Sequence, residues 1–217
     1  AWVMLGCASA YGVWWLFDRL AKPASRAIFG LAATLFIALG LVYTVLAIPS
    51  RAGNFAGPAN LDGASEVAQA NPDDWAAIQW LDANAQSGFP AGSVPVILEA
   101  PGDSYHYEGR ISAFTGYPTV LGWAGHEGQW RGNYNEQAKR EPDIATIYTT
   151  SDGQTALDLL HKWAVDYVIF GMSEQNYIRG LCSQPARACT ATLAIRKFNL
   201  VLQPVFSQGQ VTIYKVP

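Results

Sequence analysis

Two long stretches without a charged residue dominate the start of this 217-residue chain. The second stretch, from Ala27 to Ser50, contains the roughly 20 consecutive apolar residues that a helix needs to cross a bilayer. The first, from Ala1 to Phe17, is slightly shorter, and we expect it to be a span cut by the boundary of a fragment. Two apolar runs that flank a basic loop do not resemble a signal peptide, which has one short run after a basic segment. The pattern predicts two transmembrane helices within residues 1–49.

The loop between the two apolar runs sets the expected orientation. It carries one acidic residue, Asp18, against three basic residues, which are Arg19, Lys22 and Arg26. Short loops rich in Lys and Arg stay in the cytoplasm. Arg51, at the far end of the second run, is a single contrary charge. We therefore expect a multi-pass protein of the cell membrane, in contact with the lipid bilayer, whose C-terminal part lies outside the cytoplasm.

Charge and cysteine content restrict the partners of that outer part. Beyond Arg51 the chain carries 10 Lys and Arg against 16 Asp and Glu, with no basic stripe. Nucleic acid is therefore not an expected partner. Cys182 and Cys189 lie close together in a polar loop, where an oxidising compartment would favour a disulfide. Spacing alone leaves open whether they pair, because it does not fix the geometry.

Residues 72–217 have the pattern of an α/β domain, which a linker at 50–71 joins to the membrane segment. Asn71 as a cap and Pro72 in the first turn predict the start of a helix. Further helices are expected over 141–150 and 151–166, the latter capped by Ser151 or Asp152. Short β-branched runs predict strands at 93–100, 118–123 and 166–171, and a hairpin over 200–216. Alternating strands and helices indicate a mixed sheet with parallel pairing and a C-terminal β-hairpin.

The stretch 98–134 follows neither a helical nor a strand period, and it interleaves glycine, aromatic and charged residues. Such a composition predicts an ordered, largely exposed loop region that carries a binding site, with His126 and Arg131 near one cleft. Aromatic faces stack on sugar rings, carboxylates and amides bind hydroxyls, and Arg matches phosphate oxygens. The candidate substrate-binding residues are Arg110, Trp123, His126, Glu127, Trp130 and Arg131. The residues alone also allow a structural turn, in which Arg131 pairs with Glu127 and the tryptophans pack the domain.

Common catalytic and cofactor motifs are missing from the sequence. His126 is followed by Glu127, but Trp130 stands where an HExxH zinc site needs its second histidine, so we expect no metal. No serine lies in a GxSxG motif, and neither GxGxxG nor a Walker motif occurs, so we expect no cofactor. No catalytic residue can be assigned.

The segment EAPGDSYHYEGRISAFTGYPTVLGWAGHEGQWRG resembles the signature segment of the "YYY" membrane proteins, a family of large multi-spanning proteins of undetermined function. The flanking DWAAIQWL, DYVIFG and VFSQGQVTIYKV also resemble the C-terminal region of that family, so the resemblance covers most of residues 73–217. The GHExQWR core is fairly specific, whereas the flanks are generic. More distantly, the family is similar to GT-C glycosyltransferases, which have many spans and an outer α/β domain.

The resemblance implies the C-terminal part of a membrane glycosyltransferase that takes a sugar from a polyprenyl-phosphate donor and passes it to a glycan acceptor. In that class the catalytic acid lies in an outer loop between early spans, so this chain alone would be inactive. Arg110, His126 and Arg131 would bind donor phosphate or acceptor, while Trp123 and Trp130 would shape a sugar pocket. The alternatives are a non-catalytic, membrane-anchored domain that binds envelope material or carbohydrate, and a transport or assembly component.

Overall fold

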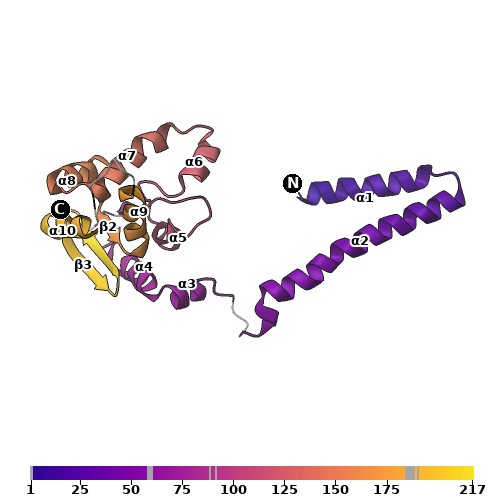
Figure 1. Ribbon diagram of the computed structural model, residues 1–217, viewed down its shortest axis with the longest axis horizontal. Helices are drawn as coiled ribbons and strands as arrows, with labels where there is room; N and C mark the ends of the chain where they lie inside the picture. Colours follow the sequence, from indigo (N-terminus) through magenta and orange to yellow (C-terminus); the bar gives the residue numbers. More distant parts are fainter. Residues whose placement is uncertain (1, 58–60, 88, 91, 184–188, 190) are drawn as a thin grey trace. The chain divides into compact units, whose positions relative to one another are not determined.

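The computed structural model describes residues 2–57, 61–87, 89–90, 92–183, 189 and 191–217. The chain divides into two compact units, residues 1–61 and 62–217 (Figure 1). The first unit contains two α-helices and a short 3₁₀ turn, which are α1 (Trp2–Arg19), α2 (Pro23–Arg51) and η1 (Gly53–Phe55).

Only one of the two predicted membrane spans is long and apolar enough to cross a bilayer. Among the described helices, α2 alone is long and apolar enough to cross a bilayer, with 29 residues and a mean hydropathy of 2.4 in its most apolar window. Helix α1 forms as expected, but its 18 residues include Asp18 and Arg19 and several weakly hydrophobic small residues. The expectation of two spans is therefore corrected to one long apolar helix.

The second unit is rich in helix and holds one four-stranded sheet. Helix α3 (Ala64–Ala70) lies within the segment predicted as a linker. The remaining elements are α4 (Pro72–Asn84), β1 (Ile97–Leu98), α5 (Arg110–Thr115), α6 (Ala124–Arg131), α7 (Asn135–Thr149), α8 (Gly153–Lys162), β2 (Tyr167–Phe170), α9 (Met172–Cys182), α10 (Ala191–Val201), β3 (Gln203–Gln208) and β4 (Val211–Lys215).

The sheet has the strand order β1-β2-β4-β3 and is mixed, as predicted. Strands β1 and β2 run parallel, with Ile97 opposite Tyr167. Strands β3 and β4 form the predicted antiparallel C-terminal hairpin, and β4 also pairs antiparallel with β2. The chain must cross from β1 to β2 by a long connection, because parallel neighbours cannot be joined by a tight turn. That connection, residues 99–166, contains all but the first residue of the segment predicted to carry the site, since Leu98 ends β1.

Both faces of β2 are buried, which explains why this strand is an uninterrupted apolar run. One face, including Leu98, Val168 and Tyr214, packs with residues of α7, α8, α9 and α10. The opposite face, including Ile97 and Ile169, packs against α4 and the start of α5. This is a three-layer α/β/α arrangement, in which α5 and α6 lie at one end of the unit (Figure 1).

The structure confirms one of the two helix caps predicted from the sequence. Asp152 caps α8 as expected, since its carboxylate accepts hydrogen bonds from the backbone N–H groups of Gln154 and Thr155. Asn71 precedes α4 but makes no side-chain capping bond. Instead, Asp73 in the first turn of α4 accepts a hydrogen bond from the backbone N–H of Gln210, in the turn of the C-terminal hairpin.

Three further predictions are corrected. The segment 98–134 is not all loop, because it contains α5 and α6. Glycines in the left-handed conformation end both helices after 6 and 8 residues, too short a run for a helical period to show. The expected strand at 118–123 is reduced to isolated bridges, one of them between Thr119 and Ile97. The expected hairpin start at residues 200–201 is instead the end of α10, which buries Ala194 and Phe198 in the core.

Candidate functional site

Helix α6 carries four of the six residues predicted to bind a ligand. His126 and Trp130 are four residues apart and share one face, and Glu127 and Arg131 share the next, as the helical period requires. Trp123 occupies the position just before the helix. Gly132 ends it with φ of 70°, a left-handed conformation that favours glycine. The GHExQWR segment is thus a short helix, whose two faces present an aromatic pair and a charged pair.

Four aromatic rings meet at this helix and form what we call the aromatic cluster, made of Tyr105, Trp123, His126 and Trp130. The ring centroids of Tyr105 and His126 lie 5.2 Å apart, and those of His126 and Trp130 lie 5.9 Å apart. Tyr105 also lies 5.5 Å from Trp123. Trp130 is 79% exposed and Tyr105 is 74% exposed. Large aromatic side chains left open to solvent in this way mark binding surfaces.

A hydrogen bond fixes the protonation pattern of the His126 ring. The indole Nε1 of Trp130 donates to Nε2 of His126 at 2.7 Å. Since indole nitrogen only donates, Nε2 must be the unprotonated nitrogen, and a neutral ring carries its proton on Nδ1. His126 therefore offers Nδ1–H as a donor while its other nitrogen holds Trp130 in place.

Tyr105 is the cluster member that sequence reasoning did not select. Its backbone φ of 67° lies in the left-handed region, which is unusual for a bulky residue. Strained backbone of this kind is found mainly at binding and catalytic sites. Its only sequence signal was its place among the aromatics of the segment 98–134.

A cavity of about 250 Å³ opens beside the aromatic cluster, and we call it the aromatic cavity. Trp123, His126 and Glu127 line it, together with Ser112 and Thr119. The hydroxyl of Thr119 is buried and has no hydrogen-bond partner. Glu127 accepts a hydrogen bond from the backbone N–H of Gly122 at 3.4 Å. One aromatic wall with carboxylate, imidazole and hydroxyl groups around it suits a ring that carries several hydroxyls.

Arg131 lies outside the lining of the aromatic cavity, although His126 is part of it. Its Nε is 3.6 Å from a carboxylate oxygen of Glu127, and the Arg131 side chain is 49% exposed. This is the ion pair that the structural interpretation of the sequence anticipated. Exposed pairs of this type contribute little to stability, so Arg131 can exchange Glu127 for a ligand at small cost.

Arg110, which was expected to bind donor phosphate or acceptor, is not at the surface of the structure. It is 3% exposed. Its Nη2 lies 2.9 Å from Asp74, and its Nη1 lies 3.2 Å from Glu174 and 3.6 Å from Glu99. Three carboxylates therefore surround one guanidinium, which leaves no positive charge for an anionic ligand.

This buried ion cluster ties together α4, the end of β1, α5 and α9. Burial by itself raises the pKa of Glu174, but Arg110 and the N–H groups of Ala100 and Gly171 outweigh burial and lower it. For Glu99, burial dominates over Arg110, and the pKa is raised. Glu99 also accepts hydrogen bonds from the backbone N–H groups of Ile111 and Ser112, at the start of α5. The buried ion cluster thus holds the start of α5 in place, and α5 belongs to the same segment of the chain as the aromatic cluster.

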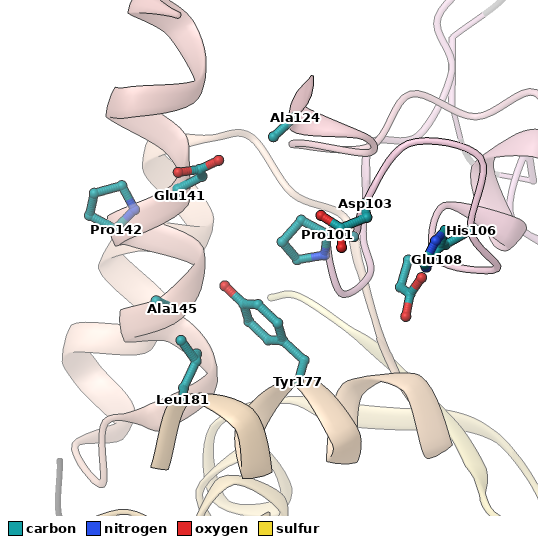
Figure 2. A pocket seen from close by; sticks show the side chains of 11 residues that line it. Pro101, Asp103, His106, Glu108, Ala124, Glu141, Pro142, Ala145, Tyr177 and Leu181 are labelled. Carbon is teal, nitrogen blue, oxygen red and sulfur yellow. The ribbon is translucent and has the colours of Figure 1, made fainter. Parts of the chain in front are cut away.

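A second, larger cavity of about 600 Å³ lies between α7, α9 and the loop after β1, and we call it the acidic cavity. Asp103, Glu108 and Glu141 line it, with His106 and Tyr177. Figure 2 shows the Tyr177 ring reaching from α9 toward the space between Glu141 on α7 and Asp103 in the loop. No Lys or Arg is among its lining residues. Within the described part of the chain, no group of three His, Cys, Asp or Glu is placed to hold a metal ion.

Comparisons with known proteins show a distant likeness of fold. Neither the protein-family models nor the curated proteins contain a match. Among solved structures, the chain is similar to the C-terminal globular domain of an oligosaccharyltransferase, AglB, from Archaeoglobus fulgidus. The sequences are 16% identical, the match covers 66% of this chain and 97% of that domain, and the TM-score is 0.41. The likeness is one of fold and is distant.

Proposed function

We propose that this chain is the membrane-anchored outer part of a GT-C-like glycosyltransferase of the "YYY" type, and that its aromatic cluster binds a sugar of the donor or the acceptor. The observation that carries the proposal is the joining of the exposed aromatic cluster to a cavity lined by Trp123, His126 and Glu127. A sugar ring would stack on the indole, and its hydroxyls would exchange hydrogen bonds with the carboxylate and with Nδ1 of His126.

The proposal of a membrane-anchored domain outside the cytoplasm is supported by two features. Helix α2 is long and apolar enough to serve as the membrane anchor. Cys182 and Cys189 form a disulfide, which is characteristic of oxidising compartments. The most specific part of the resemblance to the "YYY" signature, the GHExQWR core from Gly125 to Arg131, lies in α6 and contributes His126 and Trp130 to the aromatic cluster. A polyprenyl-phosphate sugar in the outer leaflet would reach such a domain without crossing the membrane.

A non-catalytic carbohydrate-binding domain is the second candidate, and one observation favours it. Of the two arginines expected to bind phosphate, Arg110 is neutralised inside the fold and Arg131 is paired with Glu127. The aromatic cluster therefore has a sugar-binding surface without an unpaired cation of its own for a donor phosphate. A transferase would obtain its phosphate contacts from elsewhere, or from Arg131 after it leaves Glu127.

Equilibrium binding of saccharides to the full chain in lipid nanodiscs tests the sugar site. We expect Trp130→Ala to weaken binding about three- to tenfold, since an aromatic contact contributes about 0.5–1.5 kcal/mol beyond buried area. Leu200→Ala is the matched control, because Leu200 is 80% exposed on α10 and lies outside the aromatic cluster. Equal affinities for the wild type and Trp130→Ala would contradict the sugar site.

Sugar transfer by the full-length parent separates the two candidates. Membranes would be supplied with labelled polyprenyl-phosphate sugars, and the wild type would be compared with His126→Ala and Arg131→Ala at matched protein levels. Transfer that falls sharply in both variants supports the transferase. Saccharide binding without transfer from any donor would favour the non-catalytic domain.

A further inference from the structure

The orientation of Trp130 depends on a single hydrogen bond to His126. The indole Nε1 of Trp130 donates to Nε2 of His126 at 2.7 Å, and the two ring centroids lie 5.9 Å apart. Trp130 is 79% exposed, so most of its surface contacts solvent rather than protein. Packing can therefore do little to fix the indole. The bond to His126 is what holds this ring within the aromatic cluster.

The bond between the two rings requires a neutral imidazole. Indole nitrogen donates and does not accept, so Nε2 of His126 must present its lone pair. A second proton would bind to Nε2, because Nδ1 already carries one, and the imidazolium would then donate from both nitrogens. Two N–H groups would face each other across 2.7 Å, and Trp130 would have to turn away. Histidine is the side chain that ordinarily gains a proton between pH 5 and pH 8.

The groups around His126 are compatible with uptake of that proton. The rings of Tyr105, in the loop before α5, and of Trp123 lie 5.2 Å and 5.9 Å from the imidazole. Glu127 lines the aromatic cavity beside His126. Aromatic faces and a carboxylate both favour a cation, whereas Arg131, which is paired with Glu127, opposes it. The other residues that line the cavity are uncharged, namely Gly109, Ser112, Ala113, Thr119 and Gly122.

The other tryptophan of the aromatic cluster does not depend on this proton. The indole Nε1 of Trp123 donates to the backbone carbonyl of Glu108, which does not titrate. Protonation of His126 would therefore release the Trp130 ring and leave the Trp123 ring in place. A saccharide bound at the aromatic cluster would lose one of its two indole surfaces.

We infer that neutral His126 positions Trp130 for the ligand, and that protonation of His126 releases Trp130 and weakens saccharide binding at the aromatic cluster. This inference rests on the proposed sugar site and adds a regulation by pH to it. His126 acts here through Trp130, as a positioning residue, whereas its Nδ1–H remains free to contact the ligand directly.

NMR of the indole N–H groups follows the hydrogen bond itself, on the full chain in nanodiscs with ¹⁵N-labelled tryptophan. Between pH 8 and pH 5.5, we expect the Trp130 resonance, assigned with Trp130→Phe, to move through one titration step. Trp163 is the matched control, because its Nε1 donates to Asp143 at 2.9 Å and its bond involves no histidine. A Trp130 resonance that stays as constant as that of Trp163 would overturn the inference.

Equilibrium binding of the methyl glycosides of glucose, galactose and mannose measures the consequence for the site. We expect the affinity of each glycoside that binds at pH 8 to fall about three- to tenfold at pH 5.5, as much as Trp130→Ala loses at pH 8. Trp130→Ala itself should lose little more affinity at pH 5.5, because the ring that the proton releases is already absent.

Replacement of single histidines identifies the group that takes up the proton. In His126→Gln the amide oxygen can accept from Trp130 at every pH, since residues four apart on a helix are neighbours. Whatever its affinity at pH 8, this variant should show about equal affinities at pH 8 and pH 5.5. His106→Gln is the matched control, because His106 lines the acidic cavity and not the aromatic cavity, and it should keep the wild-type pH dependence.

The outcomes separate failure of this inference from failure of the proposed function. Glycoside affinities that do not change with pH would overturn the inference and leave the sugar site standing. A pH dependence that His126→Gln retains, or that His106→Gln removes, would do the same, because another group would then be titrating. Absence of binding by all three glycosides at pH 8 would overturn the sugar site and this inference together.

Discussion

At the scale of single residues, Arg110 matters most to the second unit, residues 62–217, because several segments of the chain meet at its guanidinium. Asp74 comes from α4, Glu99 follows β1 and Glu174 lies on α9. Tyr107 adds a hydrogen bond from its hydroxyl to Asp74. A buried network of this kind is sensitive to loss of one partner, because the remaining charges stay buried without compensation.

We therefore predict that Arg110→Met lowers the free energy of unfolding by about 3–5 kcal/mol. Chemical denaturation of the full chain, followed by tryptophan fluorescence, measures this change. Arg179→Met is the control, since Arg179 is exposed on α9 and should change stability by less than about 0.5 kcal/mol. Equal small effects for the two variants would show that the buried ion cluster is not a support of the fold.

Lys197 predicts a dependence of stability on pH. It is 3% exposed, and its Nζ donates to the carbonyl of Thr150 at 2.8 Å. Burial lowers its pKa from 10.5 to about 7. Between these values the unfolded chain binds a proton that the folded chain lacks, so the free energy of unfolding rises with pH.

We expect an increase of at least about 1 kcal/mol from pH 7 to pH 9 through this group. Urea titrations at a series of pH values measure it. Lys197→Met should abolish the increase, while Lys139→Met, at an exposed position on α7, should preserve it. An identical pH profile in Lys197→Met and the wild type would contradict a neutral buried lysine.

At the scale of elements, α6 is positioned by close contact with the segment that follows it. Gly128 is buried, and a Cβ at this position would meet the ring of Tyr134. We predict that Gly128→Ala shifts α6 or the Tyr134 ring and weakens saccharide binding by about tenfold or more.

Gly180→Ala is the control for this prediction. Gly180 lies within α9 with open space around its Cα, so alanine there should stabilise the chain by about 0.5–1 kcal/mol and leave binding unchanged. Binding titrations on both variants give the comparison. Normal saccharide affinity in Gly128→Ala would mean that the placement of α6 is not critical.

Sequence reasoning predicted those elements whose local pattern agrees with their environment. Strand β2 and the cap of α8 were found because a continuous apolar run and Asp152 are direct signals. Helices α5 and α6 were missed because the glycines that end them leave only 6 and 8 residues, too few for a helical period to show. The burial of Arg110 could not be foreseen, because its three carboxylate partners lie 11, 36 and 64 residues away in sequence.

For the site, the aromatic and polar residues selected between Trp123 and Arg131 lie together on or next to α6 in the structure, and their role in binding a ligand stays a prediction. Tyr105 was not selected, because its role depends on a backbone conformation that composition does not reveal. The sequence also could not predict that Nε of Arg110 lacks a hydrogen-bond partner, because hydrogen bonding of buried groups is a property of the folded chain.

At the scale of the whole molecule, the disulfide and the apolar helix α2 make a joint prediction about topology. If the second unit, residues 62–217, lies outside the cytoplasm, Cys182 and Cys189 should be joined by a disulfide in native membranes. A membrane-impermeant reductant applied to intact cells should then expose two thiols to an impermeant maleimide. Cys182→Ser/Cys189→Ser is the control for background labelling. Labelling only after the cells are opened would place the unit in the cytoplasm.

The central claim is that a saccharide binds at the aromatic cluster, and fluorine NMR of the full chain labelled with 5-fluorotryptophan tests it most directly. The chain has eight tryptophans, and single Trp→Phe variants assign their resonances. When a saccharide that binds the chain is added, we predict that the resonances of Trp123 and Trp130 shift with its concentration. Those of Trp75, which packs on Phe114, and Trp80, which packs on Tyr167, should stay in place. Shifts at Trp75 or Trp80 without shifts at Trp123 and Trp130, or no shift for any sugar, would contradict the account.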